Sequence, residues 1–308
     1  MIRRVSILVL LLASTSSAQT LYKYRGPDGE WIYADRPPGE GSAEEVRPLD
    51  APVKSARVRI TTDSGGDSIV FTAENPLHLP VEVALRFSRL EGFEYPDPDR
   101  DLGWVLAPGS RRQLLELRKE RNGTVPAAEY TFDYRFGDPA AVHRPDTPYR
   151  VPFAVATQYP VTQAYPDLVT HTTADSRYAV DIAMPVGTDV FAARDGIVFD
   201  VSADHFRSGT DPVRDGPAAN VVQVLHEDGT YAVYAHLNWN SIRVRPGDRV
   251  IRGQYIADSG NTGFSSGPHL HFVVLRNAGM RTVSVPIAFQ GADAGSVEPA
   301  AGALLTAY

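Results

Sequence analysis

The run Gly267-Pro268-His269-Leu270-His271-Phe272 places two histidines one residue apart at the start of an apolar stretch rich in branched and aromatic residues. Such residues favour a β-strand, in which successive side chains point to opposite faces. His269 and His271 are therefore expected on one face, about 7 Å apart for a rise of ~3.3 Å per residue. Leu270 and Phe272 would face a core. Two imidazoles so placed suit one metal centre, although an isolated pair of this kind is more often a solvent-exposed feature.

The other candidate ligands decide whether this histidine pair belongs to a metal centre or is only exposed to solvent. Six of the eight histidines fall in the last part of the chain, namely His171, His205, His226, His236, His269 and His271. The chain has no cysteine, so a metal site must use His, Asp or Glu. Catalytic zinc typically takes three protein ligands and keeps one position for water. Two aspartates compete for the carboxylate position: Asp175, four residues after His171, and Asp181, ten residues after it, at the start of an expected strand.

Four motifs, in order, resemble the LytM/lysostaphin-type zinc peptidases. They are His171…Tyr178-Ala179-Val180-Asp181-Ile182-Ala183-Met184-Pro185-Val186-Gly187-Thr188, then Tyr234-Ala235-His236-Leu237, then Pro246-Gly247-Asp248, then Ser259-Gly260-Asn261-Thr262-Gly263 leading into Ser266-Gly267-Pro268-His269-Leu270-His271-Phe272. The resemblance covers about residues 149–289. Three positions depart from the family pattern without removing a ligand: Ala164 stands where Gly is frequent, Asp189 where Pro is frequent, and Val273 where Glu is frequent.

The resemblance implies a role for each residue. One Zn²⁺ per chain would be held by His171, Asp181 and His271, while His236 and His269 would be the catalytic histidines. The implied substrate is a peptidoglycan cross-link or stem peptide, with the D-Ala–diaminopimelate bond expected first and oligoglycine bridges left open. The implied activity is that of a zinc metalloendopeptidase. The alternative is a non-catalytic relative that activates cell-wall amidases.

The expected fold class is all-β. Residues 54–148 alternate apolar and polar side chains between Gly-, Pro- and Asn-containing turns, as in an antiparallel β-sandwich of immunoglobulin-like size. Residues 149–290 would form the antiparallel peptidase domain, of the duplicated hybrid motif type, and residues 291–308 a frayed tail. Residues 19–53 would hold a small aromatic β-hairpin and a linker, similar to a module that follows the signal peptide of many secreted Gram-negative proteins.

The N-terminus predicts export. Residues 1–18 combine Arg3 and Arg4, an apolar core and a small-residue cleavage site, as in a signal peptide. Removal of these two arginines changes the formal charge from −7 to −9. An acidic mature protein argues against a nucleic-acid partner. We expect a periplasmic or secreted protein with neither a transmembrane segment nor a lipid anchor, because no later stretch is long and apolar enough and no cysteine is available for lipidation.

The remaining histidines are expected outside the metal site. His78 and His143 lie beside prolines in loops, which predicts surface positions. His226 precedes the turn Glu227-Asp228-Gly229, which indicates a structural role. His205 lies in the polar segment 202–220, an expected loop at the border of the cleft.

Overall fold

The structure is a computed structural model that describes residues 20–25, 31–34, 38–39, 42–48, 56–95, 102–121 and 123–308. The predicted signal peptide, residues 1–18, lies outside the described residues. The chain divides into two compact units, residues 1–54 and 55–308. In the described residues, no helix is long and apolar enough to cross a membrane.

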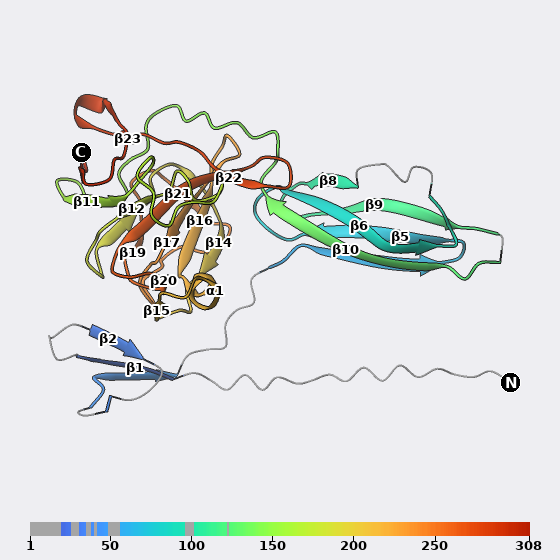
Figure 1. Ribbon diagram of the computed structural model, residues 1–308, viewed down its shortest axis with the longest axis horizontal. Helices are drawn as coiled ribbons and strands as arrows, with labels where there is room; N and C mark the ends of the chain where they lie inside the picture. The colour runs from blue at the N-terminus through green and yellow to red at the C-terminus, as the bar shows by residue number, and fades with distance from the viewer. Residues whose placement is uncertain are drawn as a thin grey trace. The chain divides into compact units, whose positions relative to one another are not determined.

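The first unit holds one small antiparallel sheet in the order β2-β1-β3 (Figure 1). Its strands are β1 (Thr20–Arg25), β2 (Trp31–Ala34) and β3 (Glu45–Pro48). The pairing of β1 with β2 confirms the predicted hairpin. β3 corrects the prediction, because it lies within the stretch expected to be a linker. It pairs with β1, where Val46 lies opposite Tyr22.

Residues 59–136 form two antiparallel sheets. One has the order β4-β5-β9-β7 and the other β10-β6-β8. The strands are β4 (Arg59–Gly65), β5 (Ser68–Asn75), β6 (Val81–Glu91), β7 (Phe93–Glu94), β8 (Gly103–Leu106), β9 (Ser110–Lys119) and β10 (Ala127–Phe136).

The two sheets share one core, as their alternating sequence requires. Along β5 every second residue is buried, and the Phe71 ring meets the edges of Phe87 and Tyr130 from the other sheet, at 5.4 and 5.2 Å between centroids. Burial of such aromatic side chains is the main stabilising contribution in a domain of this kind. The prediction of a mainly-β region is confirmed, while its immunoglobulin-like topology stays a prediction.

A nine-stranded sheet dominates the remainder of the chain, with the order β18-β14-β16-β17-β21-β12-β11-β25 and β22 paired to β21. All of these pairs are antiparallel. The strands are β11 (Gln158–Gln163), β12 (Val180–Ile182), β14 (Gly196–Ser202), β16 (Val221–Leu225), β17 (Tyr231–Ala235), β18 (Arg249–Val250), β21 (Leu270–Asn277), β22 (Thr282–Ser284) and β25 (Leu304–Thr306).

Short elements complete this part of the chain. Three strand pairs are β13 (Asp189–Phe191) with β19 (Tyr255–Asp258), β15 (Ser208–Gly209) with β20 (Gly263–Phe264), and β23 (Phe289–Gln290) with β24 (Ser296–Val297). The helices are α1 (Pro212–Asp215) and the 3₁₀ turns η1 (Gly216–Ala218) and η2 (Ala292–Ala294). The sequence, which shows no long helical period, predicted this scarcity of helix.

The C-terminal segment differs from the frayed tail expected for residues 291–308. β25 pairs with β11, and Leu305 and Ala307 are 3% and 2% exposed. Two buried apolar side chains and the hydrogen bonds of the pair outweigh the high Gly and Ala content on which that expectation rested.

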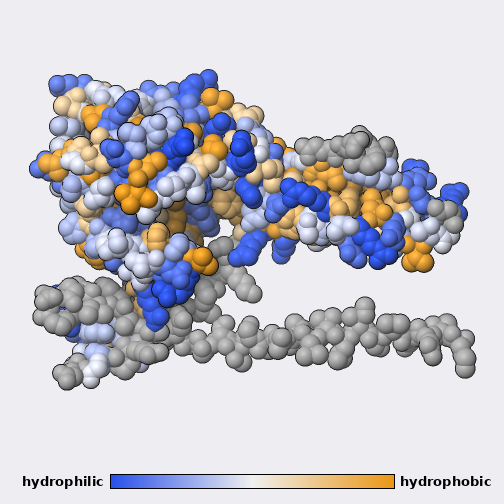
Figure 2. Space-filling view, viewed as in Figure 1, coloured by the Kyte–Doolittle hydropathy of each residue, from blue (hydrophilic) through white to orange (hydrophobic). Residues whose placement is uncertain are grey.

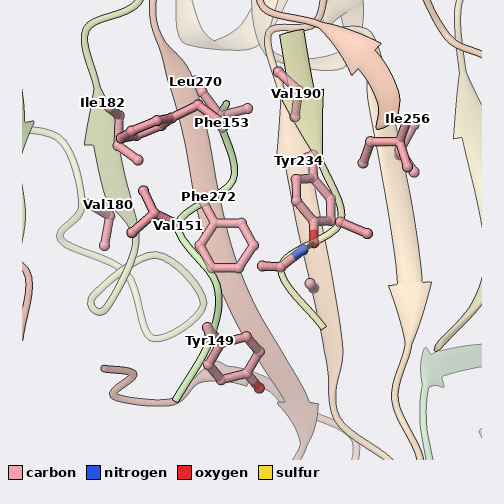
Figure 3. Packing of buried hydrophobic residues seen from close by; sticks show 14 of the residues in the cluster. Tyr149, Val151, Phe153, Val180, Ile182, Val190, Tyr234, Ile256, Leu270 and Phe272 are labelled. Atoms are coloured by element: carbon pink, nitrogen blue, oxygen red, sulfur yellow. Dashed lines mark hydrogen bonds between the residues drawn. The ribbon is translucent and has the colours of Figure 1, made fainter. Parts of the chain in front are cut away.

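The core behind the large sheet is built from the apolar faces of its central strands (Figure 3). Leu270 and Phe272 of β21 are fully buried, as the alternation predicted, and Phe272 packs against Tyr234 of β17 at 5.1 Å. The Tyr234 hydroxyl accepts a hydrogen bond from the backbone N–H of Ala193 at 2.7 Å. This packing fixes β17 and β21 side by side, which places the residues on their opposite faces close together.

The sheets of residues 59–136 also contact the large sheet. Phe136 meets the rings of Phe199 and Tyr231, at 5.3 and 6.3 Å between centroids, and the Asn277 side chain donates a hydrogen bond to Glu82 at 2.8 Å. On the face in view, hydrophilic side chains are interspersed with smaller hydrophobic patches (Figure 2).

Candidate metal centre

A row of residues crosses four neighbouring strands on the sheet face opposite the core. In the β-ladder Gln163 of β11 pairs with Asp181 of β12, Asp181 with His271 of β21, and His271 with Ala235 of β17. Directly paired residues of antiparallel strands point to the same face. The strand order therefore brings Asp181 and His271 together, although they are 90 residues apart in the sequence.

Asp181 is the centre of the cluster. Its Oδ1 lies 2.9 Å from Nδ1 of His271, and its Oδ2 lies 3.2 Å from Nε2 of His171, which comes from the loop between β11 and β12. Although burial alone would raise the pKa of this carboxyl group, the hydrogen bonds to His171 and His271 hold it well below its usual range. Asp181 is therefore an anion at neutral pH, as a metal ligand must be.

These residues fit a divalent metal ion. His171, Asp181 and His271 each offer one ligand atom, and these atoms lie within 4.8 Å of one another. The His171 side chain is 5% exposed and that of Asp181 13%, so the cluster is largely shielded from water. Two imidazole nitrogens and one carboxylate oxygen form a common zinc ligand set. Asp175, the competing aspartate, is exposed and accepts a hydrogen bond from Thr173 at 2.5 Å instead.

His269 and His236 border this cluster. His269 Nε2 is 3.7 Å from Asp181 Oδ1, while its Nδ1 donates to the backbone carbonyl of Gly267 at 2.8 Å. His236 Nδ1 donates to the carbonyl of Thr262 at 2.6 Å. Because a carbonyl oxygen can only accept, each of these rings carries a proton on Nδ1.

The backbone of His236 has an unusual, left-handed conformation. Its φ is +63°, in the left-handed region that residues other than glycine adopt at a cost of about 1 kcal/mol or more. The ring centroid lies 4.5 Å from that of His269 and 5.8 Å from that of His271. Burial, together with the charge that these two neighbours carry when protonated, lowers the pKa of His236 to about 3. His236 is therefore a neutral ring at pH 7.

The loop expected at the border of the cleft lies beside these two histidines. β15, within residues 202–220, pairs with β20, which follows Thr262. Asn220 accepts from the backbone N–H of His205 at 2.9 Å and donates to the carbonyl of Leu237, next to His236, at 3.2 Å. The His205 backbone is thus tied to the site, while its side chain is outside the ligand cluster.

The remaining histidines lie elsewhere. His78 is exposed, as predicted. His143, expected at the surface, is half-buried, because its ring stacks on Tyr149 at 6.0 Å and its Nε2 lies 3.2 Å from the tyrosine hydroxyl. His226 is buried, with Nδ1 donating to the carbonyl of Asp195 at 2.8 Å, in agreement with a structural role.

Residues 175–283 match the model of peptidase family M23. This segment is a peptidase family M23 domain. Residues 8–58 match a domain of unknown function, DUF4124. His171 lies just before the M23 match, so it is the structure that brings this residue to the other two candidate ligands.

The M23 domain is similar to several curated proteins. It is 38% identical over 96 residues to peptidoglycan DD-endopeptidase ShyA of Vibrio cholerae, a match that covers 31% of this chain and 19% of that protein. It is 36% identical over 104 residues to glycyl-glycine endopeptidase ALE-1 of Staphylococcus capitis, covering 33% and 25%. The chain thus spans a quarter or less of the length of these two relatives.

One solved structure is matched over much more of the chain. The crystal structure of a zinc containing peptidase from Vibrio cholerae is 20% identical, covers 86% of this chain and 76% of that chain, and has a TM-score of 0.34. At this TM-score the two structures do not superpose over their whole length.

Sequence reasoning missed one residue that the site uses. Gln163 belongs to none of the motifs quoted from the sequence, yet its Nε2 donates to Asp181 Oδ2 at 2.8 Å. The register of β11 against β12 shifts between Val161, which pairs with Ile182, and Gln163, which pairs with Asp181. Strict alternation would place Gln163 on the core face with Val161, so the irregularity that turns it towards Asp181 is invisible in the sequence pattern.

Proposed function

We propose that this protein is a zinc-dependent endopeptidase that hydrolyses peptide bonds in peptidoglycan cross-links or stem peptides. The observation that carries the proposal is the convergence of His171 Nε2, Asp181 and His271 Nδ1 beside two histidines, His236 and His269, whose rings are fixed by hydrogen bonds from Nδ1 to backbone carbonyls. A scaffold that only grips a peptide has no need of such a set.

In this proposal His171, Asp181 and His271 hold one zinc ion. When bound, zinc would polarise the scissile carbonyl group and make a water molecule acidic enough to attack near neutral pH. The negative charge of Asp181 would attract the zinc ion and offset part of the positive charge of that ion. With two neutral imidazoles and one carboxylate as ligands, the site keeps a net positive charge that favours a developing oxyanion.

His236 and His269 would then move protons. The backbone carbonyls of Thr262 and Gly267 accept hydrogen bonds from their Nδ1 atoms and so fix the orientation of both rings. One Nε2 would take the proton of the attacking water. That proton would then reach the departing amine through the Nε2 of the other histidine, so that both rings end with the protons they started with. A glutamate base such as that of His-Glu-x-x-His proteases is absent from the sequence, so this work falls to the two histidines.

The bond between D-Ala and diaminopimelate is the target we propose first. ShyA, by its name a peptidoglycan DD-endopeptidase, supports it, whereas the glycyl-glycine endopeptidase ALE-1 supports oligoglycine as the alternative. The peptidoglycan substrate in the name of ShyA, together with the predicted signal peptide, supports a periplasmic or secreted location.

Digestion of purified sacculi tests the proposal. The zinc-loaded protein should release soluble muropeptides, and a chelator should stop the release. The masses of the products identify the cleaved bond. If the protein carries zinc and releases nothing from sacculi of either cross-link type, the peptidase proposal is wrong. The alternative, an activator of cell-wall amidases, would then be tested by adding an amidase to the same sacculi.

A further inference from the structure

Gln163 is a buried amide at the edge of the metal cluster. It ends β11, is 5% exposed and lies opposite Asp181 in the β-ladder. A buried side-chain amide is costly unless its oxygen and both of its N–H groups are hydrogen-bonded. The partners of Gln163 therefore indicate what the residue is for.

The amide oxygen holds the loop that carries His171. Oε1 accepts the backbone N–H groups of three consecutive residues, Val169, Thr170 and His171, at 2.5, 2.6 and 3.4 Å. These three amides have no strand or helix of their own to pair with. Their convergence on one oxygen fixes the backbone that presents the His171 ring.

The amide nitrogen holds the carboxylate. Nε2 donates to Asp181 Oδ2 at 2.8 Å and to Thr170 Oγ1 at 2.9 Å. Oδ2 is the oxygen that also faces His171, while Oδ1 faces His271. Gln163 thus contacts both the carboxylate and the loop of a second candidate ligand, and it fixes the orientation of one relative to the other.

The His171 ring has no comparable support of its own. Metal-binding histidines usually donate their second ring nitrogen to a carbonyl or carboxylate, which orients the ring. Within the described residues, the buried Nδ1 of His171 has no hydrogen-bond partner. The position of this ring therefore depends on its backbone, which Gln163 holds.

We propose that Gln163 is a positioning residue of the zinc site, which presets His171 and Asp181 for the metal ion. This inference rests on the proposed zinc site. Loss of an outer-shell partner typically lowers metal affinity by about 10- to 100-fold. Methionine matches glutamine in length and can neither accept three amides nor donate to a carboxylate, so Gln163→Met removes the function with little change of volume.

The experiment compares zinc affinity in Gln163→Met, in the matched control Gln158→Met and in the unchanged protein. Gln158 lies on the same strand and is exposed. Zinc affinity is measured by competition with a chromophoric chelator, and the Co²⁺-substituted proteins are compared by their visible absorption. We expect about 10- to 100-fold weaker zinc binding and an altered Co²⁺ spectrum in Gln163→Met alone.

The outcomes separate this inference from the proposed function. Wild-type affinity and spectrum in a folded Gln163→Met protein would overturn the role of Gln163 and leave the zinc site intact. An unchanged protein that binds no zinc would overturn both. Should Gln163→Met not fold, Thr170→Val decides. This exposed position loses only the contacts of its hydroxyl group with the amide, at 2.9 Å from Nε2 and 3.4 Å from Oε1, and affinity should fall about two- to five-fold. Unchanged affinity there would refute the inference.

Discussion

The M23 domain contains two clusters of histidine and carboxylate, and only one is built to hold a metal ion. In the first, Asp181 faces nitrogen atoms of His171 and His271. In the second, Asp228 pairs with Arg194 at 2.7 Å and also accepts from the backbone N–H and the hydroxyl group of Thr230. His226 of this second cluster binds a backbone carbonyl group rather than the carboxylate.

The two clusters differ in the groups that donate hydrogen bonds to the carboxylate. The donors to Asp181 include two imidazoles, which can lose a proton and turn their lone pairs to a cation. Arg194 stays charged at any physiological pH and would repel a cation, and the other donors to Asp228 leave no lone pair for one. The pKa of both aspartates is lowered, Asp181 by imidazoles and Asp228 by Thr230 and Arg194, each against the effect of burial. Low carboxylate pKa alone therefore does not mark a metal site.

The largest expected effect is that of Asp181→Ala. Removing the only carboxylate ligand should reduce the zinc content from about one ion per chain to background and abolish release of muropeptides. Asp175→Ala is the matched control, because it removes the other aspartate near His171 and should leave zinc and activity unchanged. Elemental analysis of the purified proteins measures the first effect. If Asp181→Ala keeps about one zinc ion per chain, Asp181 is not a ligand and the contrast between the two clusters fails.

The second prediction separates ligands from proton carriers. His236→Ala and His269→Ala should each lower kcat by about 10²- to 10⁴-fold, the usual contribution of general acid–base catalysis, while zinc stays bound. His271→Ala should lose both zinc and activity. Product release from sacculi and zinc content are measured on the same samples. If His269→Ala empties the site, the division of roles within His269-Leu270-His271 is wrong.

Much of the first cluster could be predicted from sequence. The alternation at Leu270 and Phe272 places His269 and His271 on the face away from the core, and the structure confirms it. The choice of Asp181 over Asp175 came from the family resemblance, since spacing alone left both open. Gln163 could not be found, because the register shift in β11 reverses the face that strict alternation predicts.

The second cluster and the C-terminal strand could not be predicted from the sequence. Nothing near Arg194 or Asp228 in the sequence identifies the other as its partner, since the contact depends on how the connection between β13 and β14 packs against the turn between β16 and β17. Likewise, β25 contributes a short edge strand whose stability comes from contacts with β11 and not from its own composition. Long-range pairing of this kind has no local signal, which is why residues 291–308 were expected to fray.

The third prediction tests the structural nature of the second cluster. In Asp228→Ala, Arg194 loses its carboxylate partner, and its side chain is only 16% exposed. Breaking such a pair on one side should lower the free energy of unfolding by about 3 kcal/mol. Zinc content should not change. Urea unfolding with and without zinc measures both. A loss of zinc in Asp228→Ala would mean that the two clusters are coupled.

The smallest expected effect is a pH dependence from His226. Burial lowers its pKa to about 4, from 6.5, with the Asp195 carbonyl opposing the shift and the charge of Arg194 adding to it. Between pH 6.5 and 4 the unfolded chain binds a proton at this position and the folded chain does not. Stability contributed by neutral His226 is therefore complete at pH 7 and is lost as the pH falls through this window.

His226→Phe isolates this contribution, because phenylalanine keeps a ring against Tyr149 and removes the titrating group. Between pH 7 and 5 the free energy of unfolding should fall by about 2 kcal/mol less in this variant than in the unchanged protein. The pKa values of His143 and His236 are also lowered by burial. His236 titrates in both proteins and cancels in the difference, whereas the charge of His143 lowers the pKa of His226 and is part of the measured effect. Equal pH dependence in the two proteins would show that His226 takes up its proton in the folded chain at the same pH as in the unfolded chain. In that case Asp228 would have a charged imidazole as well as Arg194 beside it, and the second cluster would be even less able to accept a cation.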